Sequence, residues 1–221
     1  QYRAGYYGCI NQIDDQVGRV LRHLPGNTIV VFLSDHGDML GDHQWIRKRS
    51  AYEGSARVPL LMQFPRNWNV AREQVRNEPV ELMDVMPTLL EAAGVDVPES
   101  VDGRSLMPLL RGEQCNWRDY LHGECAAVPS LNSGQQYLTD GHRKYIWYPG
   151  TGEEQYFDID SDPQEMVDLA ANGGCESEIA KWRERLIREL DGRPEGFTDG
   201  KKLTPIGGNS PNCLPGYECP E

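Results

Sequence analysis

The sequence lacks four features that would each point to a different class of protein: a long hydrophobic run, an excess of positive charge, paired cysteines and an internal repeat. No window reaches the ~18 apolar residues that a transmembrane helix requires, so we expect no membrane span. The chain carries 22 Lys and Arg against 34 Asp and Glu, a net charge of −12. A surface of that sign repels nucleic-acid phosphates and anionic lipids, so we expect no nucleic-acid partner.

The first residues also lack an initiating methionine and the basic and apolar regions of a signal peptide. A helical pattern starts almost at once, so we expect these residues to continue a longer protein whose N-terminal half precedes Gln1. None of the six cysteines stands in a Cys-x-x-Cys pair, which disfavours a zinc site of that type. Cys213 and Cys219 could close a small loop in an oxidising compartment, and two free thiols are the open alternative.

Apolar patterning predicts an α/β fold for the first part of the chain. Residues spaced three and four apart predict an amphipathic helix over 6–24, ended by a Pro-Gly-Asn turn. The run 28–33 is β-branched without alternation, which is typical of a strand covered on both faces in a parallel sheet, and 58–64 is a second such strand. Asp84 is a candidate N-cap for a helix that ends near Ala93. This order predicts the later half of a doubly wound, mostly parallel sheet.

The pattern changes near residue 112. Short aromatic-rich segments separated by turn residues then predict a small antiparallel sheet; they are 120–124, 136–139, 144–148 and 155–159. A helix should follow, with these apolar residues on one face: Ile179, Trp182, Leu186, Ile187 and Leu190. The last stretch is rich in Gly, Pro and Asn, which predicts a loosely ordered tail. The predicted division is 1–112, 113–191 and 192–221.

A polar loop bracketed by glycines follows the first predicted strand. It reads Ser-Asp-His-Gly-Asp-Met-Leu-Gly-Asp-His over 34–43 and begins at the carboxyl end of the strand, where open α/β sheets place their ligand sites. Asp35 and His36 are adjacent, and Gly37 and Gly41 let the backbone double back so that both side chains can face one cation. From the residues alone, a metal site and a solvent-exposed polar loop remain equal alternatives.

Four cationic residues follow the loop closely: Arg47, Lys48, Arg49 and Arg57. A solvated face is the favoured interpretation for Arg47 and Arg49. A positive patch beside a metal loop also suits an anionic ester, because a metal and a lysine neutralise charge on a sulfuryl or phosphoryl group as it transfers.

Ordered blocks with compatible spacing resemble the second half of a sulfatase of the alkaline-phosphatase superfamily. They include Ser34-Asp35-His36-Gly37, Tyr52-Glu53-Gly54, Arg57-Val58-Pro59-Leu60, Asp84-Val85-Met86-Pro87-Thr88, Asp102-Gly103-Arg104-Ser105-Leu106 and Tyr156-Phe157-Asp158-Ile159. The resemblance covers roughly residues 1 to 200 and implies that 1–112 is the C-terminal part of the α/β catalytic domain.

The resemblance implies a role for several individual residues. Asp35 and His36 match the family's late pair of metal ligands, and Lys48 matches the lysine that contacts the sulfate group. His43 lies at a position near the pocket rim that can touch substrate. Arg57 is expected to support the loop by pairing with an acid. The implied metal is one divalent ion, calcium, with manganese as the alternative because imidazole nitrogen suits it better.

The family nucleophile is a formylglycine made from cysteine in a Cys-x-Pro-Ser/Ala-x-Arg motif, and none of the cysteines here stands in that motif. We therefore expect the nucleophile and two further metal ligands upstream of Gln1, and we expect the isolated chain to be inactive.

Three functions remain open at this stage. The first is a sulfuric ester hydrolase acting on a small sulfated sugar or an aryl sulfate. The second is a phosphonate or phosphate ester hydrolase of the same superfamily, since such relatives also carry the Asp-His pair. The third is a non-catalytic module that keeps the fold. By resemblance alone, an exported location is favoured over a cytoplasmic one.

Overall fold

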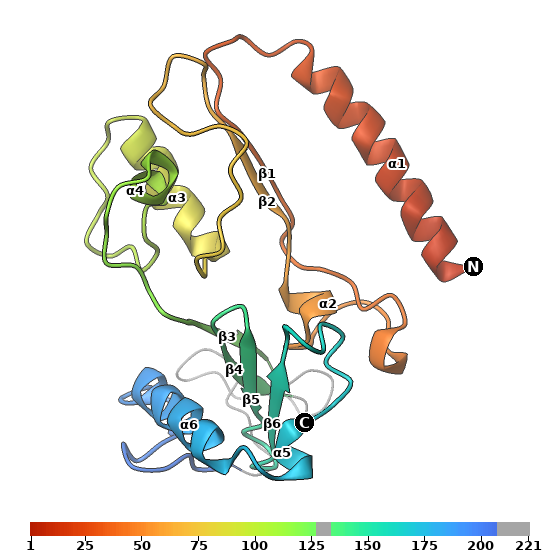
Figure 1. The fold of residues 1–221 in the computed structure, drawn as a ribbon, viewed down its shortest axis with the longest axis vertical. Helices are drawn as coiled ribbons and strands as arrows, with labels where there is room; N and C mark the ends of the chain where they lie inside the picture. Colours follow the sequence, from red (N-terminus) through yellow and green to blue (C-terminus); the bar gives the residue numbers. More distant parts are fainter. Residues whose placement is uncertain (127–133, 207–221) are drawn as a thin grey trace.

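The computed structural model describes residues 1–126 and 134–206. A long helix and a two-stranded sheet lie at one end of the molecule, and a four-stranded sheet with its helix lies at the other (Figure 1). Within these ranges, no helix is both long and apolar enough to cross a membrane. The elements, in chain order, are α1 (Tyr2–Leu21), β1 (Val30–Leu33), η1 (Asp42–Gln44), α2 (Glu53–Ala56), β2 (Leu60–Gln63), η2 (Leu82–Asp84), α3 (Val85–Ala92), α4 (Met107–Arg111), β3 (Leu121–Cys125), β4 (Gln135–Thr139), β5 (Arg143–Trp147), β6 (Glu154–Asp158), α5 (Leu169–Asn172) and α6 (Glu176–Leu190).

Helix α1 confirms the first predicted helix, although it begins and ends a few residues earlier than the pattern suggested. None of its residues is buried, so its apolar stripe lies open along the side of the two-stranded sheet. Its first turn makes polar contacts instead. The Tyr2 hydroxyl donates to Asp38 Oδ2 at 2.8 Å, and the Arg3 guanidinium donates to Asp42 Oδ1 at 2.7 Å.

Strands β1 and β2 confirm the two predicted strands but correct their direction. They pair antiparallel, with Val30 opposite Gln63 and Leu33 opposite Leu60. The prediction of a parallel pair, covered on both faces, is therefore wrong for these two strands, and Phe32 and Leu61 are exposed. A continuous apolar run indicates strand structure but does not determine the direction of its partner. The α/β class itself is confirmed.

A buried carboxylate organises the helices α3 and α4. The side chain of Asp84 is fully buried and accepts hydrogen bonds from both terminal nitrogens of Arg118 at 2.7 Å each and from the backbone N–H of Arg104 at 2.8 Å. Asp84 occupies the N-cap position of α3, as predicted, but its side chain makes no capping hydrogen bond to that helix. Three strong donors reach the carboxylate from outside the helix, and they use the lone pairs that a cap would need.

The C-terminal sheet has the order β3-β4-β5-β6, and every neighbouring pair is antiparallel, as predicted. Helix α6 covers one face of this sheet. The core between them contains Leu138, Tyr145, Trp147, Tyr156, Ile179, Trp182, Leu186 and Leu190. Aromatic residues bury the largest areas in such a core, so this sheet is the better stabilised part of the described chain.

Part of the predicted loose tail packs against the same core. Phe197 is buried edge-on against Trp147 with ring centroids 5.8 Å apart, and Thr204 N donates to Phe197 O at 2.8 Å. The prediction of a loosely ordered arm is therefore wrong for 192–206, where one buried aromatic side chain anchors a segment without regular structure. Residues 207–221, with Cys213 and Cys219, lie outside the described residues.

Candidate active site

The loop after β1 fixes the tautomer of His36. Its ring nitrogen Nδ1 lies 2.8 Å from Gly37 O, and since a carbonyl oxygen only accepts, this nitrogen is the donor. In a neutral imidazole the other nitrogen, Nε2, is then left with its lone pair directed outward. Ser34 Oγ donates to His36 O at 2.7 Å and holds the turn. Histidines that bind metals commonly have this arrangement, with one nitrogen anchored and the other free to coordinate.

Asp35, His36 and Lys48 converge at this point. Asp35 Oδ2 lies 3.4 Å from His36 Nε2, and Lys48 Nζ lies 2.5 Å from the same nitrogen. The Asp35 side chain is 82% exposed and that of His36 is 38% exposed, so an incoming ligand can reach both. The three residues that the sequence singled out as metal ligands and sulfate contact are therefore brought together.

The oxygen and nitrogen atoms present fit part of a divalent-cation site. One carboxylate oxygen and one unprotonated imidazole nitrogen face the same space, a set compatible with calcium and more so with manganese. No group of three or more potential ligands occurs in 1–126 and 134–206. These residues thus offer two ligands.

Asp38 supports the loop rather than joining this pair. Its carboxylate accepts hydrogen bonds from Leu40 N at 2.8 Å, Tyr2 OH at 2.8 Å and Arg47 N at 3.1 Å. Burial raises the pKa of the Asp38 carboxyl, but these three donors outweigh burial and lower the pKa below its usual value. The carboxylate therefore stays charged and holds the two ends of the loop 38–47 together.

Residues 40–49 contain five of the seven described residues other than glycine that have positive φ. Residues other than glycine with positive φ here are Leu40, His43, Gln44, Arg47 and Arg49. Such conformations cost on the order of 1 kcal/mol or more each and persist only where surrounding contacts impose them. The buried side chain of Met39 and the bond from Met39 N to Arg47 O, 2.7 Å long, supply two of those contacts.

His43 lies elsewhere in this loop and forms no described hydrogen bond with Asp35, His36 or Lys48. Its Nε2 lies 2.9 Å from Gln164 O, and its ring stacks on Tyr52 with centroids 4.0 Å apart. These contacts join the loop to the segment after β6. A role for His43 in substrate contact stays a prediction.

A cavity of about 440 Å³ opens beside Lys48. Its other walls are His36, Asp38, Trp45, Ile46, Arg47 and Arg49. Trp45 and Ile46 were not among the predicted site residues, although two large apolar side chains between polar neighbours are a signal that could have found them. They are 40% and 47% exposed, which gives the cavity an apolar side opposite its cationic one.

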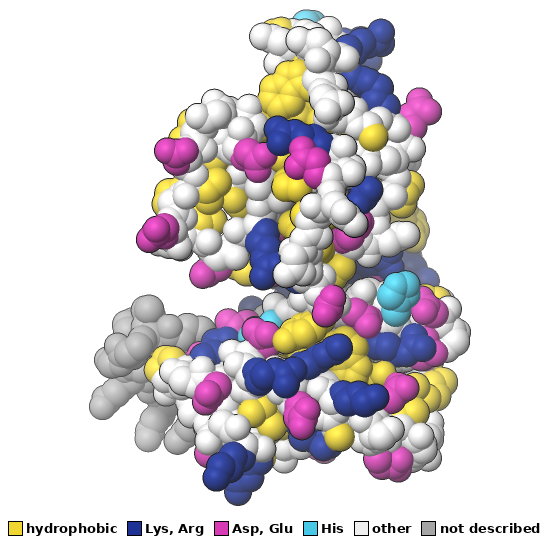
Figure 2. Space-filling model, turned by 60° about the vertical axis from the view of Figure 1, so that its left-hand side comes forward, with side chains coloured by type: hydrophobic (Ala, Val, Ile, Leu, Met, Phe, Trp, Pro, Cys, Tyr) yellow, Lys and Arg dark blue, Asp and Glu magenta, His cyan; other side chains and the backbone are white. Residues whose placement is uncertain are grey.

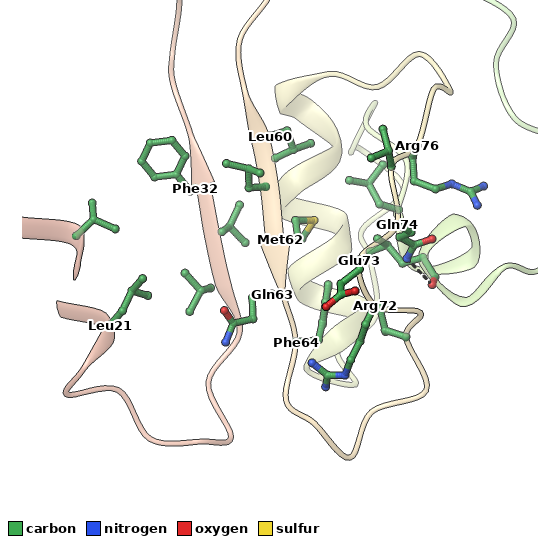
Figure 3. Close-up of a pocket in the computed structure, with 18 of the residues that line it drawn as sticks. Leu21, Phe32, Leu60, Met62, Gln63, Phe64, Arg72, Glu73, Gln74 and Arg76 are labelled. Atoms are coloured by element: carbon green, nitrogen blue, oxygen red, sulfur yellow. Dashed lines mark hydrogen bonds between the residues drawn. The ribbon is translucent and has the colours of Figure 1, made fainter. Parts of the chain in front are cut away.

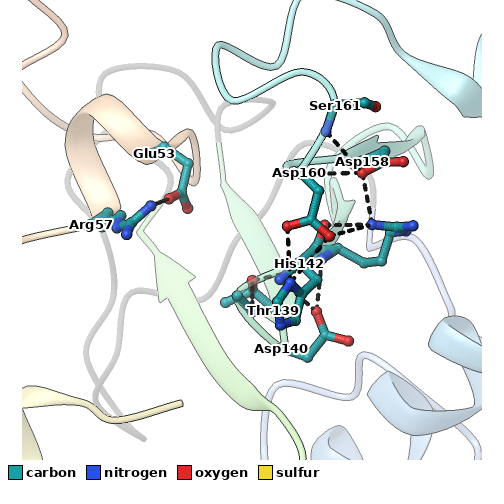
Figure 4. A network of polar contacts seen from close by, with 10 residues as sticks. Glu53, Arg57, Thr139, Asp140, His142, Asp158, Asp160 and Ser161 are labelled. Atoms are coloured by element: carbon teal, nitrogen blue, oxygen red, sulfur yellow. Dashed lines mark hydrogen bonds and ion pairs between the residues drawn. The ribbon is translucent and has the colours of Figure 1, made fainter. Parts of the chain in front are cut away.

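Arg57 pairs with an acid, as expected, but loosely. Its Nη1 lies 3.4 Å from Glu53 Oε2 on α2, and the arginine side chain is largely exposed (Figure 4). The same view shows the turn between β4 and β5, where His142 and Asp160 face each other at 2.9 Å.

A second, larger cavity of about 1,300 Å³ lies between α1, the β1–β2 pair and the segment 70–80. Figure 3 shows Leu21, Phe32, Leu60 and Met62 lining it, together with polar side chains such as Arg72 and Glu73. The candidate ligands and cations of the smaller cavity do not line it. Its surface is suited to packing rather than to chemistry.

Comparison with known proteins identifies the family of the chain. The family model described as N-sulphoglucosamine sulphohydrolase, C-terminal, matches residues 41–191. An arylsulfatase of Clostridium perfringens is 45% identical over 207 residues, which cover 91% of this chain and 42% of the relative.

Solved structures give the same result. The phosphonate monoester hydrolase SpPMH from Silicibacter pomeroyi has a TM-score of 0.75 and 28% identity, covering 85% of this chain and 40% of that one. BT4656, solved in complex with its substrate D-glucosamine-2-N,6-O-disulfate, has a TM-score of 0.69 and 25% identity, covering 84% and 40%.

The fold is thus that of the C-terminal region of an ester hydrolase of the alkaline-phosphatase type. The chain belongs to the sulfatase family, which confirms the resemblance drawn from its sequence blocks. It spans less than half the length of the relatives that it matches.

Proposed function

We propose that the whole protein to which this chain belongs hydrolyses sulfuric esters. The observation that carries the proposal is the convergence of Asp35, His36 and Lys48 at the end of β1. Membership of the sulfatase family supports it, and so does the cavity beside Lys48, which has room for a small ester.

Lys48 would bind the sulfate group. Its ammonium has three N–H donors, of which one points at His36 Nε2 in this structure, so two remain for sulfate oxygens. A hydrogen bond from a charged donor to a charged acceptor in a partly desolvated site is about twice as strong as a neutral one. Lys48 would therefore orient the sulfate and stabilise charge that builds on its oxygens.

Asp35 and His36 would hold one divalent cation, calcium by resemblance, with manganese as the alternative. Bound there, the cation would act as a Lewis acid toward the sulfate oxygens. We propose that its other ligands and the formylglycine nucleophile belong to a part of the protein outside these residues. With Nδ1 bound to Gly37 O, Nε2 is the nitrogen that would coordinate the cation, in exchange for the hydrogen bond that it accepts from Lys48 Nζ in this structure.

The substrate alcohol would be a small sulfated sugar or an aryl group. Trp45 and Ile46 give the cavity an apolar wall against which a ring can pack. The substrate named for BT4656 is a sulfated glucosamine, which supports the sugar. An exported protein remains part of the proposal, by resemblance alone.

Phosphonate or phosphate ester hydrolysis is the second candidate. The structural likeness to a phosphonate monoester hydrolase favours it. Both esters place a tetrahedral anion next to the cation and Lys48, so the same residues serve either reaction.

The test measures turnover of an aryl sulfate and an aryl phosphonate by the full-length protein and two alanine variants. Lys48→Ala should lose on the order of 3 kcal/mol of transition-state stabilisation, or ~10²-fold in kcat/KM, and Lys48→Arg should recover only part of it. Arg47→Ala is the matched control and should change kcat/KM less than about threefold, the scale of a surface charge. Equal and small effects of the two alanine variants would remove the sulfate-binding role, and preference for the phosphonate would select the second candidate.

A further inference from the structure

The C-terminal sheet contains a lysine that is buried completely. Lys144 on β5 has its Nζ 2.7 Å from Ala51 O, 2.7 Å from Glu53 Oε1 and 2.8 Å from Glu165 Oε1. A buried ammonium is costly unless it is paired, and here two hydrogen bonds and a close ion pair with Glu165 Oε1, which has no hydrogen-bond partner of its own, surround the charge. Burial raises the pKa of the Glu165 carboxyl, and the nearby Lys144 ammonium opposes that shift.

Two of the partners of Lys144, Ala51 and Glu53, lie in residues 50–55, which we call the 50–55 segment. The third partner, Glu165, is hydrogen-bonded to this segment. Glu165 Oε2 accepts a hydrogen bond from Glu53 N at 2.6 Å, and Gln135 Oε1 on β4 accepts one from Ala51 N at 2.6 Å. Ala51 itself is buried. Three parts of the C-terminal sheet region, β4, β5 and the loop after β6, thus hold the backbone of this segment.

The 50–55 segment also adjoins both parts of the anion site. Lys48 precedes it by two residues. On the other side, Gly37 N donates to Ser55 O at 2.8 Å, immediately after His36. A Cβ at Gly37 would lie 2.2 Å from Gly54 O, so main chain touches main chain there without room for a side chain. A shift of the segment is therefore transmitted to Lys48 along the chain and to Gly37, next to His36, through this backbone contact.

We propose that Lys144 is a positioning residue for the reaction, acting through the 50–55 segment to set the spacing between Lys48 and the Asp35–His36 pair. The inference rests on the proposed function for the meaning of that spacing. The physical basis of the positioning role does not depend on the proposed function, because Lys144 connects the C-terminal sheet to the 50–55 segment. Replacing a buried ion network by apolar groups can leave stability unchanged while the geometry that the network fixed is lost.

The experiment uses the full-length protein with Lys144→Met and with the double variant Lys144→Met/Glu165→Gln. The double variant removes two opposite charges together, so that the Glu165 carboxylate is not left buried beside a missing ammonium. The glutamine oxygen can still accept a hydrogen bond from Glu53 N. We therefore expect the double variant to fold even if Lys144→Met alone does not. We expect kcat to fall about tenfold with KM changed little, because a displacement of a fraction of an ångström at the reacting group has effects of this order. Arg183→Met is the matched control: Arg183 pairs with Glu154 in the same sheet region and contacts no residue of the 50–55 segment.

A double-mutant cycle identifies the route of the effect. In the Lys48→Ala background, the loss caused by the Lys144 variant should shrink to less than about twofold, since the group being positioned is already gone. Additive losses, or a fall in thermal stability with kcat unchanged, would overturn the positioning role while leaving the sulfatase proposal intact.

Amide hydrogen exchange gives a readout that does not depend on turnover. Exchange of the amides in 48–55 should accelerate in the Lys144 double variant and stay unchanged in Arg183→Met. If wild-type protein hydrolyses neither ester, the proposed function fails, and this measurement still decides the mechanical link. Unchanged exchange over 48–55 would refute that link.

Discussion

The two sheets of the molecule differ in how their apolar side chains are covered. In the four-stranded sheet, α6 and the aromatic residues bury one another, and Tyr145, Trp147 and Leu186 have almost no exposed surface. In the β1–β2 pair, Phe32 and Leu61 remain exposed although these two strands are the more apolar in sequence. The candidate metal ligands Asp35 and His36 come directly after β1, one strand of this exposed pair.

The four-stranded sheet thus contains the buried core, whereas the candidate site residues follow the exposed β1–β2 pair. Ion pairs join several charged side chains of the four-stranded sheet region, among them Arg143–Asp158 and Arg183–Glu154, and Figure 2 shows charges of both signs interspersed over both parts of the face that it draws. Those pairs satisfy one another within the sheet region. The site loop instead keeps cations and acceptors that face a cavity.

Asp35→Ala should separate the two regions most sharply. In the full-length protein we expect loss of the bound divalent ion and of nearly all activity, on the order of 10³-fold, because a Lewis acid contributes several kcal/mol to the reaction. The free energy of unfolding measured without metal should change by less than about 0.5 kcal/mol, since the Asp35 side chain is 82% exposed. Elemental analysis and denaturant titration check both halves, and an unchanged metal content would refute the assignment.

Leu186→Ala should have the opposite profile. Leu186 is fully buried under the four-stranded sheet, so the chain should lose about 2–5 kcal/mol of stability through the cavity that forms. Leu61→Ala on the exposed face of β2 is the matched substitution and should cost less than about 0.5 kcal/mol in the same chain. Urea unfolding of the two variants measures the contrast. Equal losses would show that the two sheets are covered alike.

Trp45→Ala should affect substrate binding more than the chemical step. Packing of an aromatic substrate ring on Trp45 should contribute about 0.5–1.5 kcal/mol of binding free energy. Its loss should raise KM for an aryl ester about two- to tenfold, with little change in kcat. Ile46→Ala is the neighbouring control on the same cavity wall. A fall in kcat with KM unchanged would place Trp45 in the chemistry instead.

The smallest effect concerns the exposed His142–Asp160 pair. The hydrogen bond to Asp160 raises the pKa of His142 above its ordinary value of 6.5, so the folded state binds the proton more tightly than the unfolded one. The pair therefore adds stability below pH 6.5, and this contribution is lost as pH rises through the folded pKa. Titration of the His142 ring by NMR, with Asp160→Asn as the comparison, checks the direction of the shift. An unchanged His142 pKa in that variant would exclude Asp160 as the cause.

Local sequence patterns predicted most helices and strands. They failed for features that depend on contacts with residues far away in the sequence. The aromatic alternation before Trp147 and the apolar face of α6 predict the C-terminal sheet and its helix, because each residue finds its partner nearby. The direction of β1 against β2 depends on how the long connection between them returns, which no local pattern records. Phe197 lies in a segment rich in glycine and proline. That composition predicts a loose tail and gives no sign that Phe197 anchors the segment to the core.

The candidate site was predictable to the extent that its residues are close in sequence. Asp35 and His36 are adjacent, and Lys48 follows in the same loop, so the family blocks contained all three. Lys144 and Glu165 also stand in segments that resemble the family, but the resemblance implied no role for either residue. Nothing in the local sequence shows that a lysine in an aromatic strand will be buried against a loop far earlier in the chain.

The contact between Gly37 and Gly54 limits how this protein can vary. Because the chain after His36 meets the 50–55 segment through backbone atoms, the spacing between Lys48 and the Asp35–His36 pair does not depend on any side chain at the point of contact. Cavity residues such as Trp45, Ile46 and Arg49 can then be exchanged without altering that spacing. A library that varies these positions and keeps both glycines should yield altered preferences among ester alcohols, whereas a library that varies the glycines should yield mainly inactive protein.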